Sequence, residues 1–254
     1  MSEPRETPPK TGRFTLDTAV KLAILGLCVV LTVDVALRRL SPLAASAAPG
    51  VATRTRPPGT PTEAPLPNEL LSLELAALKG DANAPVAIIA YSDFQCPYCR
   101  VFARTIWPEL QRELISTGLA QFAFRHLPLD TIHPYARRIG AVAECARQLG
   151  KFWEFHDAAF ERQKELATVD LGDLAASIGL QKPAVAECLG KNGAIDSVKR
   201  DSDEAASLGV RGTPTFFIGR VEPNGRVRVT QRLVGAQAVD SFRTAVASAT
   251  ATPK

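Results

Sequence analysis

The chain has 254 residues, of which 46% are hydrophobic, and its formal net charge is +4. This length and composition are typical of one globular domain with attached segments. The basic residues are scattered and do not alternate with aromatic residues as in proteins that follow a phosphate backbone, which argues against nucleic acid as a partner.

The N-terminal region contains an apolar segment at residues 19–40. Its length is close to the ~20 residues that a helix needs to cross a bilayer, although only residues 22–33 are free of charge. Three interpretations stay open: an uncleaved transmembrane anchor, a secretory signal cleaved near residues 45–47, and a buried core helix. We favour the anchor because Arg38 and Arg39 occupy a stretch that signal peptides keep uncharged. The anchor and the signal would both export the rest of the chain.

The apolar segment divides the chain into further parts. Residues 1–18 are expected to form a short cytoplasmic tail, and residues 41–67 are rich in Ala, Pro, Thr and Gly. The latter range has too few large apolar side chains to offset the entropy of ordering it, which predicts a flexible linker. Residues 68–250 are then expected to fold as one unit, with a helical insertion at about 133–208.

The folded unit begins with a strand, a helix and a second strand. Residues 85–91 form a continuous apolar run, which is typical of a strand buried on both faces. After it, apolar residues recur at helical intervals up to Gly118, and residues 121–127 have the pattern of a strand. In this order the elements form a βαβ unit, which implies that the two strands are parallel.

A helical block and a hairpin complete the unit. Five segments with helical spacing are separated by glycines, and they cover residues 134–149, 152–163, 171–178, 183–189 and 194–208. Strands are expected at 215–218 and 227–234, joined through Asn224 and Gly225, which are a strong hairpin signal. A last helix is expected at 239–247. The order of elements predicts an α/β fold with a helical insertion.

Cys96 and Cys99 lie between the first strand and its helix, in the sequence Cys-Pro-Tyr-Cys. Pro97 suits the first helical position because its φ is already helical and its missing amide proton would have no partner there. The helix therefore begins at the pair, and its N-terminal amides favour a thiolate at Cys96. Cys99 lies almost one turn further on and is expected to be the more shielded. We predict that Cys96 attacks a disulfide and that Cys99 resolves the mixed disulfide.

Three other interpretations of the pair are weaker. A zinc site needs four ligands, and Cys145 and Cys188 stand alone without a second C-x-x-C. A structural disulfide across so short a loop would constrain the unfolded chain little. Two unrelated thiols are not expected between a strand and a helix. We expect neither a metal ion nor an organic cofactor, because the dithiol is its own redox centre.

Three motifs carry a resemblance to a known family. They are DFQCPYC at residues 93–99, GKFWEFHD at 150–157 and GVRGTPTFFIG at 209–219. In this order they resemble the DsbA-like branch of the thioredoxin superfamily, over nearly everything after the linker. The resemblance implies a thioredoxin-like fold with a helical insertion and thiol-disulfide oxidoreductase activity on protein substrates. It also implies a membrane redox partner that recycles the dithiol.

The resemblance also implies roles for residues near the pair. Pro214 is implied to be a cis-proline that faces the cysteines, with Thr213 offering its backbone to an extended substrate. Pro97 and Tyr98 are expected to contact substrate as well. Tyr98 departs from the strongly oxidising DsbA pattern, which has His at this position and so a charge that stabilises the thiolate. Tyr98 together with Thr213 is similar to the isomerase and reductase branch that includes DsbG, so the net direction of exchange stays open.

Cys145 and Cys188 lie on two predicted helices of the insertion. Each alone would be interpreted as a small buried hydrophobic residue. Because an exported domain meets an oxidising compartment, we favour a structural disulfide between them.

Other polar and aromatic residues have simpler interpretations. Asp93 is expected to make local hydrogen bonds at a strand end rather than to adjust the pKa of a thiol. The three histidines are expected to be structural, and they are His126, His133 and His156. Phe94, which precedes the pair, is expected to join Tyr98 in an apolar patch for unfolded substrates.

The sequence thus predicts an exported, membrane-tethered thiol-disulfide oxidoreductase. We expect it to be a single-pass protein of a bacterial inner membrane, with its catalytic domain on the periplasmic or extracytoplasmic side. Two alternatives stay open: a disulfide isomerase or reductase of the same fold, and a non-catalytic chaperone that holds peptides and in which the cysteine pair is incidental.

Overall fold

The computed structural model describes residues 65–251. The predicted tail at 1–18, the predicted transmembrane helix at 19–40 and most of the predicted linker lie outside the described residues. Within residues 65–251, none of the helices combines the length and the apolar character that crossing a membrane requires.

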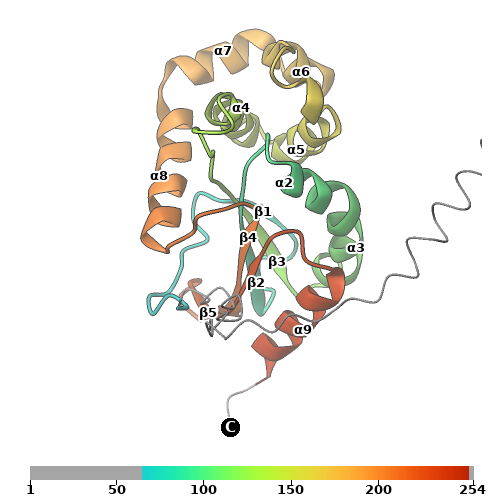
Figure 1. Ribbon diagram of the computed structural model, residues 1–254, viewed down its shortest axis with the longest axis vertical. Helices are drawn as coiled ribbons and strands as arrows, with labels where there is room; N and C mark the ends of the chain where they lie inside the picture. The colour runs from blue at the N-terminus through green and yellow to red at the C-terminus, as the bar shows by residue number, and fades with distance from the viewer. Residues whose placement is uncertain (1–64, 252–254) are drawn as a thin grey trace, which may run out of the picture. The chain divides into compact units, whose positions relative to one another are not determined.

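A five-stranded sheet lies at the centre of the described region, with the strands in the order β1-β3-β2-β4-β5 (Figure 1). The strands are β1 (Ala77–Lys79), β2 (Val86–Ser92), β3 (Gln121–His126), β4 (Thr215–Val221) and β5 (Val227–Val234). β2 and β3 are parallel, as the βαβ prediction requires, and the other pairs are antiparallel. The sequence did not predict β1, because three residues are too few to display a strand period.

The helix that follows β2 is less regular than its apolar spacing predicted. It runs through α2 (Pro97–Val101), the π-helical η1 (Phe102–Ile106), α3 (Trp107–Leu110) and a second π-helical stretch, η2 (Gln111–Ile115). Pro108 has no amide proton and its ring would crowd the carbonyl one turn earlier. The wider π-helical turn directly before it accommodates both effects.

The five predicted helices of the insertion are all present. They are α4 (Ala136–Gln148), α5 (Phe152–Glu161), α6 (Leu171–Ser177), α7 (Lys182–Gly190) and α8 (Gly193–Ser207). A short 3-10 turn, η3 (Gln163–Glu165), follows α5. Figure 1 shows α4 to α7 gathered at one end of the sheet, while α8 runs back along it and α9 (Val239–Thr250) lies beside α3.

Side chains of β2 are buried on both faces of the sheet, as its continuous apolar run predicted. Ile88 and Ala90 face an aromatic core that also contains Phe122. Ile89 and Tyr91 face a smaller core on the side of α8. Because β2 carries the Cys-Pro-Tyr-Cys motif at its end, the motif is attached to the most deeply buried strand of the sheet.

A buried polar network holds α8 against the sheet. Arg125 of β3 donates from Nη1 to Asp201 of α8 at 2.9 Å, and both side chains are almost fully buried. The hydroxyl of Tyr91 donates to Glu204 at 2.6 Å. Burial raises the pKa of Tyr91 above its usual range, which keeps its hydroxyl protonated and able to donate.

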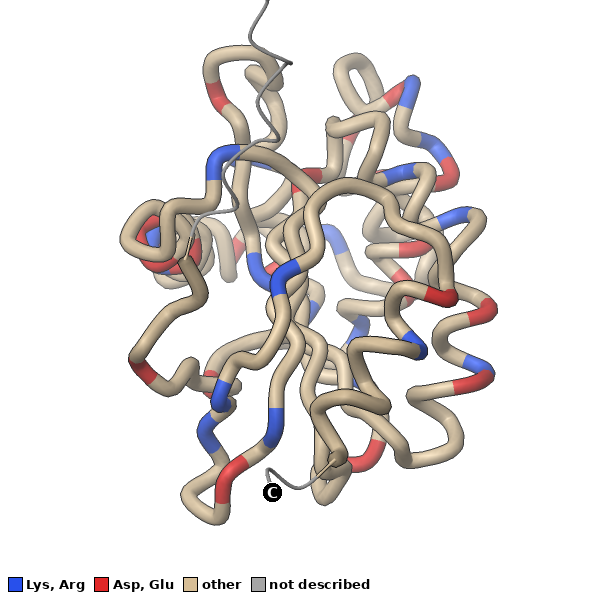
Figure 2. The backbone as a smooth tube through the Cα atoms, turned by 60° about the horizontal axis from the view of Figure 1, so that its bottom comes forward, with Lys and Arg blue, Asp and Glu red and all other residues tan. Residues whose placement is uncertain are grey.

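Charged residues are distributed over the whole described region. Figure 2 shows Lys and Arg interspersed with Asp and Glu along the chain rather than gathered on one face. This arrangement lacks the basic stripe that binding to a phosphate backbone requires.

Candidate functional site: a dithiol at a helix N-terminus

The cysteine pair lies at the junction of β2 and α2. Helix α2 begins at Pro97, and Cys96 precedes it as the N-cap residue in an extended conformation, with φ −68° and ψ 123°. The amide of Arg100 donates to the carbonyl of Cys96 at 3.1 Å. Cys96 therefore lies where the free amides of the first helical turn favour negative charge, as the position of Pro97 predicted.

The turn before β4 lies against the pair. β4 is antiparallel to β2, with Thr215 opposite Tyr91, and this register brings residues 213–214 to the end of β2. The Thr213–Pro214 peptide bond is cis. The Sγ atom of Cys96 lies 3.3 Å from the carbonyl oxygen of Thr213 and donates to it when protonated.

The two thiols differ strongly in acidity. A hydrogen bond from Cys99 lowers the pKa of Cys96 to about 6, and hydrogen bonds from the backbone amides of Tyr98 and Cys99 act in the same direction, against the effect of burial. Burial raises the pKa of Cys99 well above its usual range, and the neighbouring Cys96 raises it further. At neutral pH the site holds a thiolate at Cys96 and a thiol at Cys99.

The two cysteines are both buried and differ little in their exposed fractions. Cys96 is 4% exposed and Cys99 is 1% exposed, so Cys99 is the more shielded, as expected, but by a small margin. Pro97 is exposed and Tyr98 is 65% exposed, so both lie on the surface beside Cys96. The buried residues Thr213 and Pro214 lie on the other side of Cys96.

Asp93 connects the active-site turn to the loop that follows β3. It is buried, and its Oδ1 atom accepts from the amide of Gln95 at 2.7 Å, the local hydrogen bond expected from the sequence. Its Oδ2 atom accepts from the amide of Leu129 at 2.9 Å and lies 2.7 Å from Nδ1 of His133. The sequence did not predict this second connection, because 40 residues separate His133 from Asp93.

Gln163 connects the same turn to the helical insertion. Its Nε2 atom donates to the carbonyls of Phe94 and Cys96, both at 2.9 Å. Close by, Nε of Arg100 donates to the carbonyl of Phe160 at 3.0 Å. No spacing or motif in the sequence marks Gln163 as part of the site, because the turn η3 that positions it has no pattern of its own.

Comparison with known proteins places this fold and motif in a family. The sequence model of the family described as Thioredoxin matches residues 75–232. The chain belongs to the thioredoxin family. The predicted thioredoxin-like α/β fold with a helical insertion is therefore confirmed.

The relatives of this chain differ in how much of their own length is matched. Na(+)/H(+) antiporter NhaA 3 of Salinispora tropica is 34% identical over 177 residues, which are 70% of this chain and 25% of that protein. Disulfide bond formation protein D of Bacillus subtilis is 32% identical over 148 residues, 55% of this chain and 65% of that protein. The chain thus spans less than two thirds of the length of either relative.

A solved structure supports the same fold. The crystal structure of oxidised BdbD from Bacillus subtilis superposes on this thioredoxin-family chain with a TM-score of 0.59 at 24% identity. The match covers 71% of this chain and 98% of that one.

The expectation that Phe94 contributes to an apolar surface patch is wrong. Its ring is buried, 5.4 Å from the ring of Phe124 and 5.0 Å from that of Phe160. Gln163 holds the carbonyl of Phe94, and the tight turn directs the ring into the aromatic core. Tyr98 alone of the two is at the surface.

The histidines have polar partners within the fold. His126 is buried and lies 3.2 Å from Glu144, and His156 is buried with Nδ1 2.8 Å from Asp157. Burial lowers the pKa of His156, which favours its neutral form. The structural role expected for these two residues is consistent with their positions.

Cys145 of α4 and Cys188 of α7 are joined by a disulfide, with Cα atoms 5.8 Å apart. It links two helices of the insertion. Cys96 and Cys99 are both free thiols.

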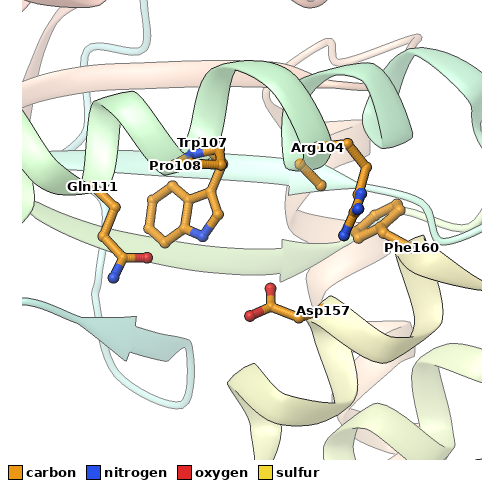
Figure 3. Close-up of a pocket in the computed structure, with 7 residues that line it drawn as sticks. Arg104, Trp107, Pro108, Gln111, Asp157 and Phe160 are labelled. Carbon is orange, nitrogen blue, oxygen red and sulfur yellow. The ribbon is translucent and has the colours of Figure 1, made fainter.

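A side pocket of about 410 Å³ lies between α3 and α5 and is separate from the dithiol (Figure 3). Trp107 and Gln111 line one side of it and Asp157 lines the other, and neither Cys96 nor Cys99 contributes. The dithiol therefore lies outside this pocket, with the exposed residues Pro97 and Tyr98 beside it. Within residues 65–251 no group of three or more His, Cys, Asp or Glu side chains is arranged to hold a metal ion.

Proposed function

We propose that this chain is a DsbA-like thiol-disulfide oxidoreductase that exchanges disulfides with protein substrates through Cys96 and Cys99. The observation that carries the proposal is the position of the free thiol Cys96 as the N-cap of α2, beside the buried free thiol Cys99, which lowers the pKa of Cys96 to about 6. The likeness to a protein named Disulfide bond formation protein D supports it.

The geometry suits a two-step exchange. The thiolate of Cys96 attacks one sulfur of a substrate disulfide, forms a mixed disulfide and releases the other substrate sulfur as a thiolate. Bond formation removes the negative charge from Cys96, and with it one cause of the raised pKa of Cys99. Cys99 then loses its proton, attacks Cys96 and releases the second substrate thiol. Two electrons pass from the dithiol to the substrate, and the reverse sequence oxidises a substrate dithiol.

The residues on either side of Cys96 would position the substrate. The carbonyl of Thr213 points at the sulfur, and Pro214 lacks an amide proton, so this edge of the site is open to an extended chain. Pro97 and Tyr98 offer exposed surface on the helix side. We assign the four residues to substrate binding.

The second candidate function is that of a mild oxidant or a reductase, and the residue that favours it is Tyr98. A phenol, unlike an imidazolium, offers no positive charge, so Tyr98 adds no ionic stabilisation to the Cys96 thiolate and hence to the reduced form. Equilibration with glutathione separates the candidates, because a potential near −120 mV characterises an oxidase and one near −270 mV a reductase.

Replacing the attacking sulfur tests the function. We expect Cys96→Ser to lower insulin reduction, or refolding of a reduced substrate, to the rate without protein, because no thiolate remains to attack. Cys99→Ser is the matched control: it should still attack and should accumulate the mixed disulfide. Equal behaviour of wild type and Cys96→Ser would contradict the enzyme and favour a peptide-holding chaperone.

A membrane tether is a further part of the proposal. The apolar segment at 19–40 supports it, and a disulfide such as Cys145–Cys188 persists in an oxidising compartment such as the bacterial periplasm. The chain would then be a single-pass protein of the inner membrane with an extracytoplasmic catalytic domain and a membrane-bound recycling partner. Recovery of the full-length chain in alkali-washed membranes, with the domain open to added protease, supports the tether; a soluble, shortened chain contradicts it.

A further inference from the structure

The side pocket between α3 and α5 has polar groups on both of its walls. Its volume of about 410 Å³ lies within the range of about 300–1,000 Å³ that is usual for small-molecule sites. Trp107 and Gln111 line the wall formed by the helix after β2, and Asp157 lines the wall formed by α5. Figure 3 shows the indole nitrogen of Trp107 and the carboxylate of Asp157 directed toward the same space from opposite sides. The pocket therefore offers a donor and an acceptor to one ligand.

Trp107 supplies the donor. The chain has two tryptophans, whose rings stack with their centroids 5.4 Å apart. Nε1 of Trp153 donates to the carbonyl of Leu78 at 2.9 Å, whereas Nε1 of Trp107 has no acceptor among the side chains and carbonyls of residues 65–251. Trp107 is only 4% exposed, and a buried indole N–H normally has a partner. An oxygen atom of a ligand in the pocket would satisfy this donor.

The uncompensated charge at the pocket is negative. Arg104 lines the pocket but forms an ion pair with Glu161, so the two together add no net charge. Oδ1 of Asp157 lies 2.8 Å from Nδ1 of His156, and burial lowers the pKa of His156, which favours the neutral imidazole. The carboxylate of Asp157 therefore has no cation opposite it in the pocket and favours a positively charged ligand.

The rest of the lining is apolar. It comes from Ala103, Pro108 and Phe160. Such surface suits the methylene groups of a basic compound, which pack against apolar walls while the charged end meets a carboxylate. A bare metal ion would leave these walls without contacts.

We propose that this pocket binds an organic cation that also carries a hydrogen-bond acceptor, with its ammonium or guanidinium group at Asp157 and an oxygen at Nε1 of Trp107. An arginine residue of a polypeptide and free arginine share this chemistry. The site contains neither Cys96 nor Cys99, so the inference is independent of the proposed function.

The test uses the full chain, isotope-labelled at its indole nitrogens, and two probes. N-acetyl-arginine amide carries the cation and acceptor oxygens, and N-acetyl-citrulline amide replaces the guanidinium by a neutral urea of nearly the same shape. Calorimetry should show at least about fivefold tighter binding of the arginine probe, because a charged donor strengthens the bond to Asp157. The indole signal of Trp107 should shift more than that of Trp153, which already has an acceptor. Trp153→Phe assigns the two signals.

Asp157→Asn should bring the affinity ratio of the two probes to near one, because it removes the charge and keeps the shape. Asp203→Asn is the matched control, since Asp203 lies on α8 and both carboxylate side chains are 62% exposed. Its ratio should equal that of wild type, and thermal unfolding should show that both variants fold. Equal affinities in wild type, an unchanged ratio in Asp157→Asn, or an unmoved Trp107 signal overturns the site.

Free arginine separates the two sources of the ligand. Tighter binding of the capped probe indicates an arginine residue of a polypeptide, and tighter binding of free arginine indicates a small molecule. Cys96→Ser should bind either compound as wild type does, so failure of the proposed function leaves this result unchanged.

Discussion

The described region has two pairs of cysteines, whose side chains are identical but whose structural environments differ. Cys96 and Cys99 are free thiols within one helical turn, at the end of a central strand and beside an exposed surface. Cys145 and Cys188 are bonded across 43 residues and join two helices of the insertion.

The comparison shows which features make a cysteine reactive. Hydrogen bonds from Cys99 and from the backbone amides of the first turn of α2 stabilise the thiolate of Cys96. Cys145, in contrast, is buried in the last turn of α4, where backbone amides are bound within the helix and cannot stabilise a thiolate. Position relative to a helix N-terminus thus separates a redox pair from a structural one.

Removing the bonded pair is expected to have the largest effect on stability. The double substitution Cys145→Ala/Cys188→Ala should lower the free energy of unfolding by about 4 kcal/mol, because the unfolded chain regains the entropy of a 43-residue loop. Urea unfolding of the oxidised wild type and the variant measures the difference.

The same double variant should keep its activity. Under conditions where it is folded, it should exchange disulfides as fast as wild type, because neither residue lies at the reacting sulfur. Equal stability of variant and wild type, or loss of exchange in the folded variant, would show that the division between structural and redox pairs is wrong.

A smaller effect is expected from adding charge beside the reactive pair. Tyr98→His should place a positive charge near the thiolate of Cys96 and stabilise the reduced form, which makes the redox potential more positive by about 30 mV for each tenfold change in the equilibrium constant. Equilibration with glutathione measures the shift. Ser116→His adds the same group at the far end of the helical stretch and should leave the potential unchanged; an equal shift in both variants would refute a local charge effect.

Local sequence patterns predicted much of the fold and part of the candidate site. Residues 85–91 are apolar because β2 is buried on both faces, and Pro97 marks the helix start because its chemistry permits few other positions. Family resemblance indicated the turn at Thr213 and Pro214, which apolar periodicity alone could not relate to Cys96.

Local sequence patterns did not predict contacts between residues that are far apart in the sequence. Gln163 and His133 reach the active-site turn only through the folded insertion, and neither has a neighbour in sequence that reveals its partner. The sequence predicts a surface position for Phe94 because it lies two residues before a reactive cysteine, yet the turn points its ring into the core. The π-helical stretch before Pro108 likewise reflects how the backbone adapts to a proline, which periodicity does not record.

The rate of alkylation of Cys96 as a function of pH tests the central claim most directly. The thiolate is the reacting form, so the rate should rise with pH, reach half its maximum near the pKa of about 6 and be nearly constant above pH 7. The Cys99→Ala variant should shift the midpoint to higher pH, because it loses the side chain that donates to Cys96. A wild-type midpoint near 9.0, the pKa of an ordinary thiol, would contradict the account.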